Sequence, residues 1–474
     1  MKFVKTMLCR MLCRKHRGAA LILSMIFILI FSALAVSIAS LADTNVQIAD
    51  NQHKTNCSRA CAESGIEITR FWLNRVSVLG TTAPGLIFGQ IANSLQSDLT
   101  VNGISNIVPD YDGSTSIITI PNVTLDSTNE QNFYASMAPK PTVSDPNTLQ
   151  VDVTGVYSSV AKTISVNYKF GTRAHTVFDY GVATKGPLSL AGNIELDGVN
   201  VSVESDVYIV SENELLALSI IGNSQIAGDV HIANPLATVD LQGGQAGIGG
   251  ETGQDAIDNH VSFGVPPTEF PVPDPGYFEH YVTNIFDTET DTTADLMLEN
   301  IRIPAGTNPT FSGNVTLTGI VFIETPNIVT FSGNTNITGI IVGDGDYEDN
   351  SAVNQIIFQG NVDSSPVSEL PDESQFAGIR EETGTFLMAP GFKASFGGNF
   401  ETLNGAIAAS GISFFGNAGG AINGSVINYS ETPMTLSGNS DLSFNRLEAG
   451  SVPAGFVPEI ILEYDPTSYS EIVL

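Results

Sequence analysis

Two nearly identical stretches, FSGNVTLTG at residues 311–319 and FSGNTNITG at residues 331–339, follow each other closely in the chain. In each, an apolar residue and one spacer precede a Gly-Asn pair, and another glycine follows at the end of the stretch. Alternating apolar residues predict short strands, and Gly and Asn tolerate the positive φ angles of tight corners. A fixed motif that recurs at about 20 residues is typical of a solenoid.

Further copies of the Gly-Asn motif lie on both sides of this pair, at residues 190–198 and 221–228 and near residues 358, 396, 415 and 436. The candidate corner residues are Gly192, Asn193, Gly222, Asn223, Gly313, Asn314, Gly333, Asn334, Gly360, Asn361, Gly398, Asn399, Gly416, Asn417, Gly438 and Asn439. The later corner glycines are unevenly spaced, with the widest gaps from Gly333 to Gly360 and from Gly360 to Gly398. We therefore expect insertions, such as residues 343–351 and 364–375, to loop out of individual repeats.

The repeats predict a right-handed parallel β-helix, in which the apolar residue before each Gly-Asn pair stacks inward and the asparagines form a ladder. An antiparallel sandwich is the alternative, but recurrence of one turn motif favours the β-helix. The predicted parts are first repeats at 181–250, a Pro-rich insertion or strap at 251–300, a main β-helix at 301–450 and a C-terminal cap or tail at 451–474.

The N-terminal residues predict a membrane helix. Residues 18–42, GAALILSMIFILIFSALAVSIASLA, contain no charge and are long enough to span a bilayer. The segment before Gly18 is basic and contains no acid, so this flank should stay cytoplasmic and the bulk of the chain should lie outside. Because helical character continues without proline, we expect one helix over 19–79, with 19–42 in the membrane or filament core.

Residues 80–180 predict a small antiparallel β-sheet. Period-two alternation with β-branched residues marks strands at 116–125, 149–157 and 163–170. We expect this sheet to pack on the C-terminal half of the long helix. The fold class is thus mainly β with a long N-terminal helix, a small antiparallel headgroup and a parallel β-helix.

The leader ending in Arg17-Gly18, the apolar run and the helical stretch RACAESGIEITRFWL at residues 59–73 resemble the N-terminal domain of PilX-type type IV minor pilins. The resemblance implies that a prepilin peptidase removes residues 1–18 by cutting between Gly18 and Ala19, and that Ala19 is methylated. The fifth mature residue would be Leu23 instead of the glutamate of major pilins. A minor pseudopilin of a type II secretion system also lacks this glutamate, and a plain signal anchor is a further alternative.

The resemblance implies a role in pilus assembly or priming and in surface adhesion. Its implied partners are other pilins or pseudopilins, the prepilin peptidase, the inner membrane and surface glycans. The chain would cross the inner membrane once, with its bulk outside the cytoplasm, and reach the pilus or cell surface after assembly.

The charge balance argues against two other classes of function. With 19 basic and 50 acidic residues, a net of -31, the chain lacks the basic footprint that nucleic acid requires. A membrane-anchored β-helical carbohydrate-active enzyme is the alternative function, but only Arg302, Arg380, Lys393 and Arg446 are basic after residue 300, and no motif surrounds them. We expect no enzymatic activity and no catalytic residues.

We expect no cofactor, although two groups of residues could hold a metal ion. Asp344, Asp346 and Asp349 offer oxygen ligands for Ca²⁺, but the twelve-residue loop with a terminal glutamate is absent. His53, Cys57 and Cys61 share one stripe of the predicted helix, where a metal site, helix packing and an intersubunit disulfide are all open.

Overall fold

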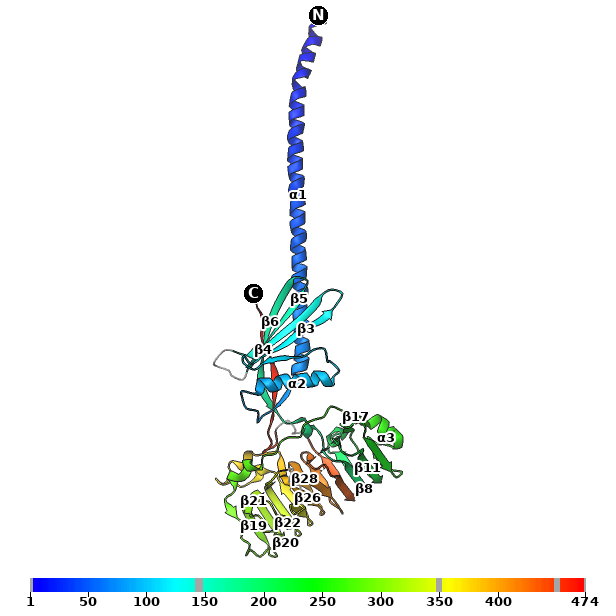
Figure 1. Cartoon of the computed structure of the whole chain (residues 1–474), viewed down its shortest axis with the longest axis vertical. Helices are drawn as coiled ribbons and strands as arrows, with labels where there is room; N and C mark the ends of the chain where they lie inside the picture. Colours follow the sequence, from blue (N-terminus) through cyan, green and yellow to red (C-terminus); the bar gives the residue numbers. More distant parts are fainter. Residues whose placement is uncertain (1–2, 141–147, 347–351, 447–451, 473–474) are drawn as a thin grey trace. The chain divides into compact units, whose positions relative to one another are not determined.

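The computed structural model describes residues 3–140, 148–346, 352–446 and 452–472, with side chains from Ala20 onward. The protein is mainly β with one long N-terminal helix (Figure 1). It divides into two compact units. The first comprises residues 1–76, 85–170 and 462–474, and the second comprises residues 77–84 and 171–461.

The first unit is built on helix α1, Phe3–Leu73, which runs through the apolar stretch and the polar extension without a break. From Ala20 to His53 its side chains are exposed, whereas Ala62, Ile66 and Leu73 are buried. The helix ends at Leu73 and not at the predicted residue 79, because residues 77–79 form strand β1 (Ser77–Leu79) instead.

Helix α2, Ile87–Val101, lies within residues 80–180, where the sequence predicted only an antiparallel sheet. It is amphipathic, and its buried residues are Phe88, Ile91, Ala92, Leu95 and Leu99. These positions follow the i, i+3, i+4, i+7 pattern of one helix face, so the sequence did contain a signal for this element.

An antiparallel sheet packs against the C-terminal part of α1. Its order is β33-β6-β5-β4-β3-β2, with β1 beside β33 at Glu459–Ile461. The strands are β2 (Asp110–Asp112), β3 (Ile117–Asp126), β4 (Gln131–Pro139), β5 (Thr148–Tyr157), β6 (Val160–Arg173) and β33 (Glu459–Ile472). The predicted C-terminal tail therefore supplies a strand next to β6, and in the first unit Lys169 Nζ lies 3.6 Å from Asp465 Oδ2.

Two glycines bring α1 and this sheet together. A Cβ on Gly155 of β5 would lie 2.2 Å from Ala62 N and from Ser58 O of the helix. A Cβ on Gly65 of the helix would lie 2.7 Å from the side chains of Phe133 and Val153. The backbone of β5 thus touches the backbone of α1 at Gly155, and the backbone of α1 touches side chains of the sheet at Gly65; a Cβ at either position would clash.

The second unit contains two sheets made of the repeats, whose strands pair in parallel apart from the antiparallel pair β15–β16. The larger sheet contains β7 (Val182–Thr184), β8 (Leu188–Gly192), β10 (Val207–Ile209), β11 (Leu216–Gly222), β13 (Val230–Ile232), β14 (Thr238–Gln242), β17 (Val261–Phe263), β18 (Asn284–Ile285), β19 (Leu296–Ile303), β20 (Thr310–Phe311), β21 (Val315–Ile323), β22 (Ile328–Phe331), β23 (Thr335–Gly343), β24 (Gln355–Phe358), β25 (Val362–Ser365), β26 (Thr385–Phe396), β28 (Ala406–Phe414), β30 (Val426–Asn428) and β31 (Met434–Gly438). The smaller sheet contains β9 (Glu195–Gly198), β12 (Gln225–Ile226), β15 (Gly247–Ile248), β16 (Glu251–Thr252), β27 (Thr402–Leu403), β29 (Gly420–Ile422) and β32 (Leu442–Phe444). A short helix, α3 (Gly253–His260), follows β16.

The parallel pairings give an order of strands that differs from chain order. It runs β17-β13-β10-β7-β30-β28-β26-β23-β21-β19-β18. The first repeat strand, β7, therefore lies between β10 and the late strand β30, and β8 and β9 likewise lie beside β31 and β32. The two repeat groups form one continuous hydrogen-bonded stack.

The Pro-rich residues 264–283 connect β17 to β18, which lie at opposite ends of this order. Ten ladder steps of about 4.8 Å amount to roughly 50 Å, and this connection can span up to roughly 70 Å when it is extended. Phe270, Phe278 and Tyr281 of this strap pack with Tyr208, Tyr429, Met388 and other apolar residues of the stack. The strap is thus long enough to return the chain along the whole stack, and it is held by its aromatic side chains.

A column of aromatic rings fills the interior of the later repeats. Phe311, Phe331, Phe358, Phe396 and Phe414 are buried and stack with ring centroids 5.0–5.2 Å apart. The column continues in register as Leu436, Leu190 and Ile220. These are the apolar positions that precede the Gly-Asn motif.

Candidate functional site

The corners of the repeats are the part of the second unit that the sequence singled out. Gly313, Gly333, Gly360 and Gly398 lie one above another, and a Cβ on each of the last three would be 2.0–2.1 Å from the carbonyl oxygen of the glycine before it. These glycines are required by close approach of neighbouring strands. Gly192, Gly222, Gly416 and Gly438 have positive φ angles, so there the backbone conformation itself favours glycine.

Asparagines form short ladders at these corners. Asn334 Nδ2 donates to Asn314 Oδ1 at 3.2 Å, and Asn314 Nδ2 donates to Asp295 Oδ1 at 3.1 Å. Asn439 Nδ2 donates to Asn417 Oδ1 at 3.4 Å. The ladder is therefore made of separate segments.

A second ladder was missed in the sequence. Asn423 Nδ2 donates to Asn404 Oδ1 at 2.7 Å, Asn445 Nδ2 to Asn423 Oδ1 at 3.1 Å, and Asn200 Nδ2 to Asn445 Oδ1 at 3.3 Å. The last of these bonds joins the late repeats to the early ones. The similar stretches LNG at residues 403–405 and ING at residues 422–424 are the signal that could have revealed this corner.

A polar groove lies on the first corner where the two repeat groups meet. It is lined by Asn193, Ile194, Glu195, Asn223, Gln225, Gln245 and Asp441. Leu196 pairs with Leu442 on one side and with Ile226 on the other. The residues just before them, Asp441, Glu195 and Gln225, therefore form one row. Asn193 and Asn223 form a second row beside it, because Gly192 pairs with Gly222. The groove therefore has two rows of carboxylate and amide side chains.

A larger pocket lies at the second asparagine corner and includes Asn404, Asn423, Asn445, Ser425 and Arg446 in its lining. The Arg446 guanidinium donates to the carbonyl oxygens of Asp179, Val203 and Glu204. Burial lowers the pKa of Arg446 below its usual range. This arginine is therefore bound to the backbone of the early repeats.

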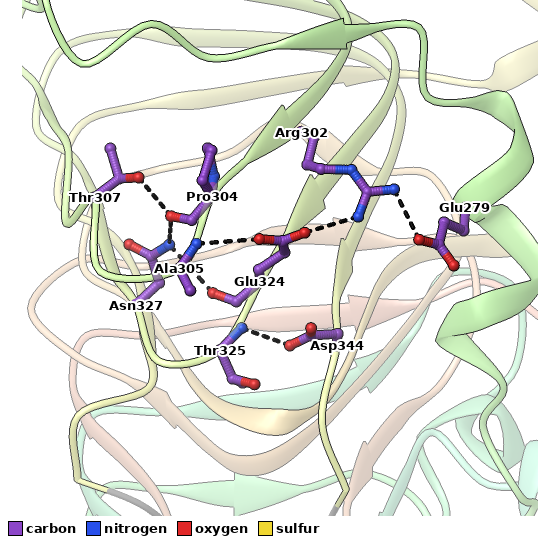
Figure 2. Close-up of polar contacts among 9 residues, drawn as sticks. All are labelled: Glu279, Arg302, Pro304, Ala305, Thr307, Glu324, Thr325, Asn327 and Asp344. Carbon is purple, nitrogen blue, oxygen red and sulfur yellow. Dashed lines mark hydrogen bonds and ion pairs between the residues drawn. The ribbon is translucent and has the colours of Figure 1, made fainter.

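The other arginines of the late repeats are also engaged. Figure 2 shows Arg302, whose Nη1 lies 2.8 Å from Glu324 Oε1 and whose Nη2 lies 3.0 Å from Glu279 Oε1. Hydrogen bonding from Arg302 holds the pKa of the Glu324 carboxyl below its usual range. Arg380 Nη1 lies 2.7 Å from Asp372 Oδ1. Each of these two arginines thus has a carboxylate partner within the unit.

Only two of the three residues predicted as Ca²⁺ ligands, Asp344 and Asp346, lie in the described part of the chain. Asp344 Oδ1 accepts a hydrogen bond from Thr325 N at 2.6 Å (Figure 2), and burial raises the pKa of this carboxyl. Asp346 is exposed, and Asp349 lies outside the described residues. Among the residues that the structure describes, no group of three or more His, Cys, Asp or Glu side chains has the geometry to hold a metal ion.

Cys57 and Cys61 of α1 are free thiols. Cys57 is half-buried, and its Sγ lies 3.7 Å from His53 Nε2. Cys61 is buried against the sheet, and this burial raises the pKa of its thiol. Of the three residues on the predicted stripe, Cys61 thus packs in the interior while His53 and Cys57 touch each other.

The N-terminal part of α1 is the other candidate functional element. It is long and apolar enough to cross a membrane, with a mean hydropathy of 2.8 over its most apolar window, none of which is buried. Gly18 and Ala19, the predicted processing site, lie within this helix.

No protein-family model matches the chain, and no curated protein matches it. Among solved structures, it is similar to the crystal structure of the competence-associated pilin ComZ from Thermus thermophilus, with 8% identity and a TM-score of 0.25, over 89% of this chain and 98% of that one. A TM-score this low carries no argument about the fold or the function of this chain.

Proposed function

We propose that the chain is a minor pilin or pseudopilin subunit whose second unit is a binding module. The observation that carries this proposal is α1, a single helix with an apolar, exposed N-terminal part and a C-terminal part buried against an antiparallel sheet. An apolar helix that continues into a folded head can anchor in a membrane and then pack among like helices. The PilX-like leader and helix sequence support the finer assignment to PilX-type minor pilins.

In this proposal, residues 1–18 are removed by a prepilin peptidase between Gly18 and Ala19, and Ala19 is methylated. The basic residues before Gly18 keep the leader cytoplasmic, so the bulk of the chain after the membrane helix lies outside. The subunit resides in the inner membrane until it enters a filament with other pilins or pseudopilins, where it helps to prime assembly and takes part in adhesion.

We also propose that the second unit winds as a right-handed parallel β-helix. In-register parallel pairing of successive repeats, such as Gly319 with Gly339, supports this arrangement. Right-handed connections are the strong preference between parallel strands of one sheet. A β-helix presents long rows of side chains, which suits binding of extended ligands.

We propose that this module acts by binding and not by catalysis. Hydrolases and lyases of acidic polysaccharides need free basic groups beside their carboxylates. Three of the four basic residues after residue 300 are engaged within the protein, since Arg302 and Arg380 are paired with carboxylates and Arg446 is bound to backbone carbonyls. This supports a structural role for these three, and the fourth, Lys393, lies alone among them on β26.

The test is mass spectrometry of the N-terminus after expression with a prepilin peptidase. We expect a chain that begins at Ala19 and carries one methyl group, and we expect the protein in sheared surface filaments. The matched variant Gly18→Val should keep the leader, because the residue before the cut is changed. A wild-type chain that retains residues 1–18 would contradict the proposal.

A further inference from the structure

The groove at the junction of the two repeat groups has side chains that the protein itself leaves available. In the described parts of the chain, the side chains of Asn193, Asn223 and Glu195 make no hydrogen bond to another protein group, and all three are exposed. At the corner next to the groove on the side of the late repeats, Asn439 Nδ2 donates to Asn417 Oδ1 at 3.4 Å. The asparagine ladder is therefore open at this groove.

Two other polar side chains of the lining, Asp441 and Gln225, are held in place by hydrogen bonds. Asp441 Oδ1 accepts from Glu195 N at 3.0 Å, and Gln225 Nε2 donates to the carbonyl oxygen of Gln245 at 3.2 Å. The backbone between the two rows is fixed by Gln225 N donating to Ile194 O at 2.7 Å. A ligand would therefore meet two side chains, Asp441 and Gln225, that are already oriented, which lowers the entropy cost of binding to them.

The chemistry of the lining selects one class of ligand. Carboxylates accept hydrogen bonds and amides both donate and accept, so together they can bind the adjacent hydroxyl groups of a sugar ring. The lining contains no lysine or arginine and includes two carboxylates, so a uronate, a sulfated glycan or nucleic acid would be repelled. Ile194 is its only apolar residue and is buried, so no apolar side chain or acyl chain would find a complementary surface.

The groove is also periodic. Its two rows cross successive repeats, and neighbouring parallel strands lie about 4.8 Å apart. The same type of group is therefore presented at a regular interval along the stack, which matches a polymer with a repeating unit better than a single small molecule.

We propose that this groove binds a polysaccharide that is neutral or carries amino groups, with Asn193, Glu195, Asn223 and Gln225 as hydrogen-bonding residues. This rests on the proposed adhesive function and specifies its ligand. Because Asp441 belongs to the late repeats while the other residues belong to the early ones, the site exists only when both repeat groups are assembled.

The test uses the full-length chain in detergent and three soluble probes, namely cellohexaose, a glucosamine hexamer and a galacturonate hexamer, with affinity measured by calorimetry. We expect one or both of the first two to bind more tightly than the galacturonate hexamer. The double variant Asn223→Ala/Gln225→Ala should weaken that binding by about tenfold or more, as expected from the loss of two hydrogen bonds. Ser219→Ala, on strand β11 of the same repeat but outside the groove, is the matched control and should leave affinity within about twofold, since it removes no groove hydrogen bond.

Circular dichroism and the midpoint of thermal unfolding show whether the variants remain folded. Binding of the preferred probe by a folded double variant as tightly as by the wild type would overturn the inference, as would preference for galacturonate or absence of binding to all three probes. Processing at Ala19 and incorporation into filaments are measured on the same chains. If the chain is processed and enters filaments but binds no probe, only the groove inference is refuted. If the chain binds a probe but is never processed, the groove inference is supported and the proposed filament role is refuted.

Discussion

Glycine has two different roles at the corners of the second unit. At Gly192 and Gly438 a positive φ angle favours glycine, as the Gly-Asn motif predicts. At Gly333 and Gly360, whose φ angles are not positive, the reason is contact with the carbonyl oxygen of the preceding corner glycine. Gly192 and Gly438 make the same contact, with a Cβ 2.3 and 2.4 Å from such an oxygen, in addition to their positive φ angles. The sequence motif is the same in both cases, so only the structure separates a requirement of backbone conformation from a requirement of space.

Gly333→Ala should destabilise the second unit by about 1–3 kcal/mol, the usual cost of an overpacked site. The added Cβ would lie 2.0 Å from Gly313 O, a backbone atom that cannot rotate away. Gly244→Ala is the control, because a Cβ there meets nothing within 4 Å. Chemical denaturation measures both variants, and equal stability of the two would contradict the contact argument.

Asp344 and Glu324 should have opposite effects on stability as pH changes. Burial raises the pKa of the Asp344 carboxyl in the folded protein above its ordinary value. The protonated carboxyl therefore stabilises the fold below the ordinary pKa, and this stabilisation is lost as pH rises through the folded-state pKa. Asp344→Asn keeps an acceptor for Thr325 N and should therefore stabilise the protein at pH 7, with the gain disappearing in acid.

The matched variant Glu324→Gln should behave in the reverse way. Arg302 lowers the pKa of Glu324, so its contribution is present above the ordinary pKa and is lost as pH falls through the folded-state pKa. The variant should be less stable than the wild type at pH 7 and similar to it in acid. Thermal unfolding at pH 3 and pH 7 measures both variants, and a pH-independent difference in either would refute the assigned cause.

At the scale of elements, local sequence periodicity predicted which segments form helices and strands, but it did not predict which strands pair with each other. The apolar run and the continuing helical pattern predicted α1, and alternation predicted strands that correspond to β3, β5 and β6. The tail that contains β33 was interpreted as a cap or tail because it is acidic and apolar and terminal repeats need a cap. Its neighbour in the sheet, β6, lies far away in the chain. Hydrogen bonds between distant strands leave no local pattern to detect.

Gly155→Ala should destabilise the first unit selectively, by about 1–3 kcal/mol, because the added Cβ would meet the helix backbone at Ala62 and Ser58. Hydrogen exchange should rise in α1 and β5 while strands β21 to β24 of the second unit stay protected. Gly85→Ala, where a Cβ meets nothing within 4 Å, is the control in the same unit. Equal exchange in both variants would show that α1 and β5 do not pack as closely as described.

For the whole molecule, the order of strands in the stack differs from their order in the chain. The chain starts the stack at β7, continues to β17, returns through the Pro-rich strap to β18 and comes back to β30 beside β7. This return places the first and last repeats side by side, and the asparagine bond between Asn445 and Asn200 lies at that junction.

Leu436→Ala in β31 should loosen the early strand β8, although their sequences are far apart. Leu436 is buried and lies in register with Leu190, and such a truncation costs about 2–5 kcal/mol. Hydrogen exchange should therefore increase in residues 188–192 more than in residues 328–331. Val329→Ala in β22 is the control and should give the opposite distribution. Unchanged exchange in β8 of the Leu436 variant would contradict the strand order.

The sequence by itself determined the local features of this protein: an uncharged helix long enough for a membrane, alternating strands, and corners spaced for stacking. These depend on the periodicities of helices and strands and on the conformational range of Gly and Asn, which neighbouring residues define. Only the tertiary structure decided which strands meet, how the strap joins the ends of the stack, and where Asp441 aligns with Glu195 and Gln225. Those pairings depend on contacts between residues that are distant in the chain, whose free energy exists only once the chain has folded.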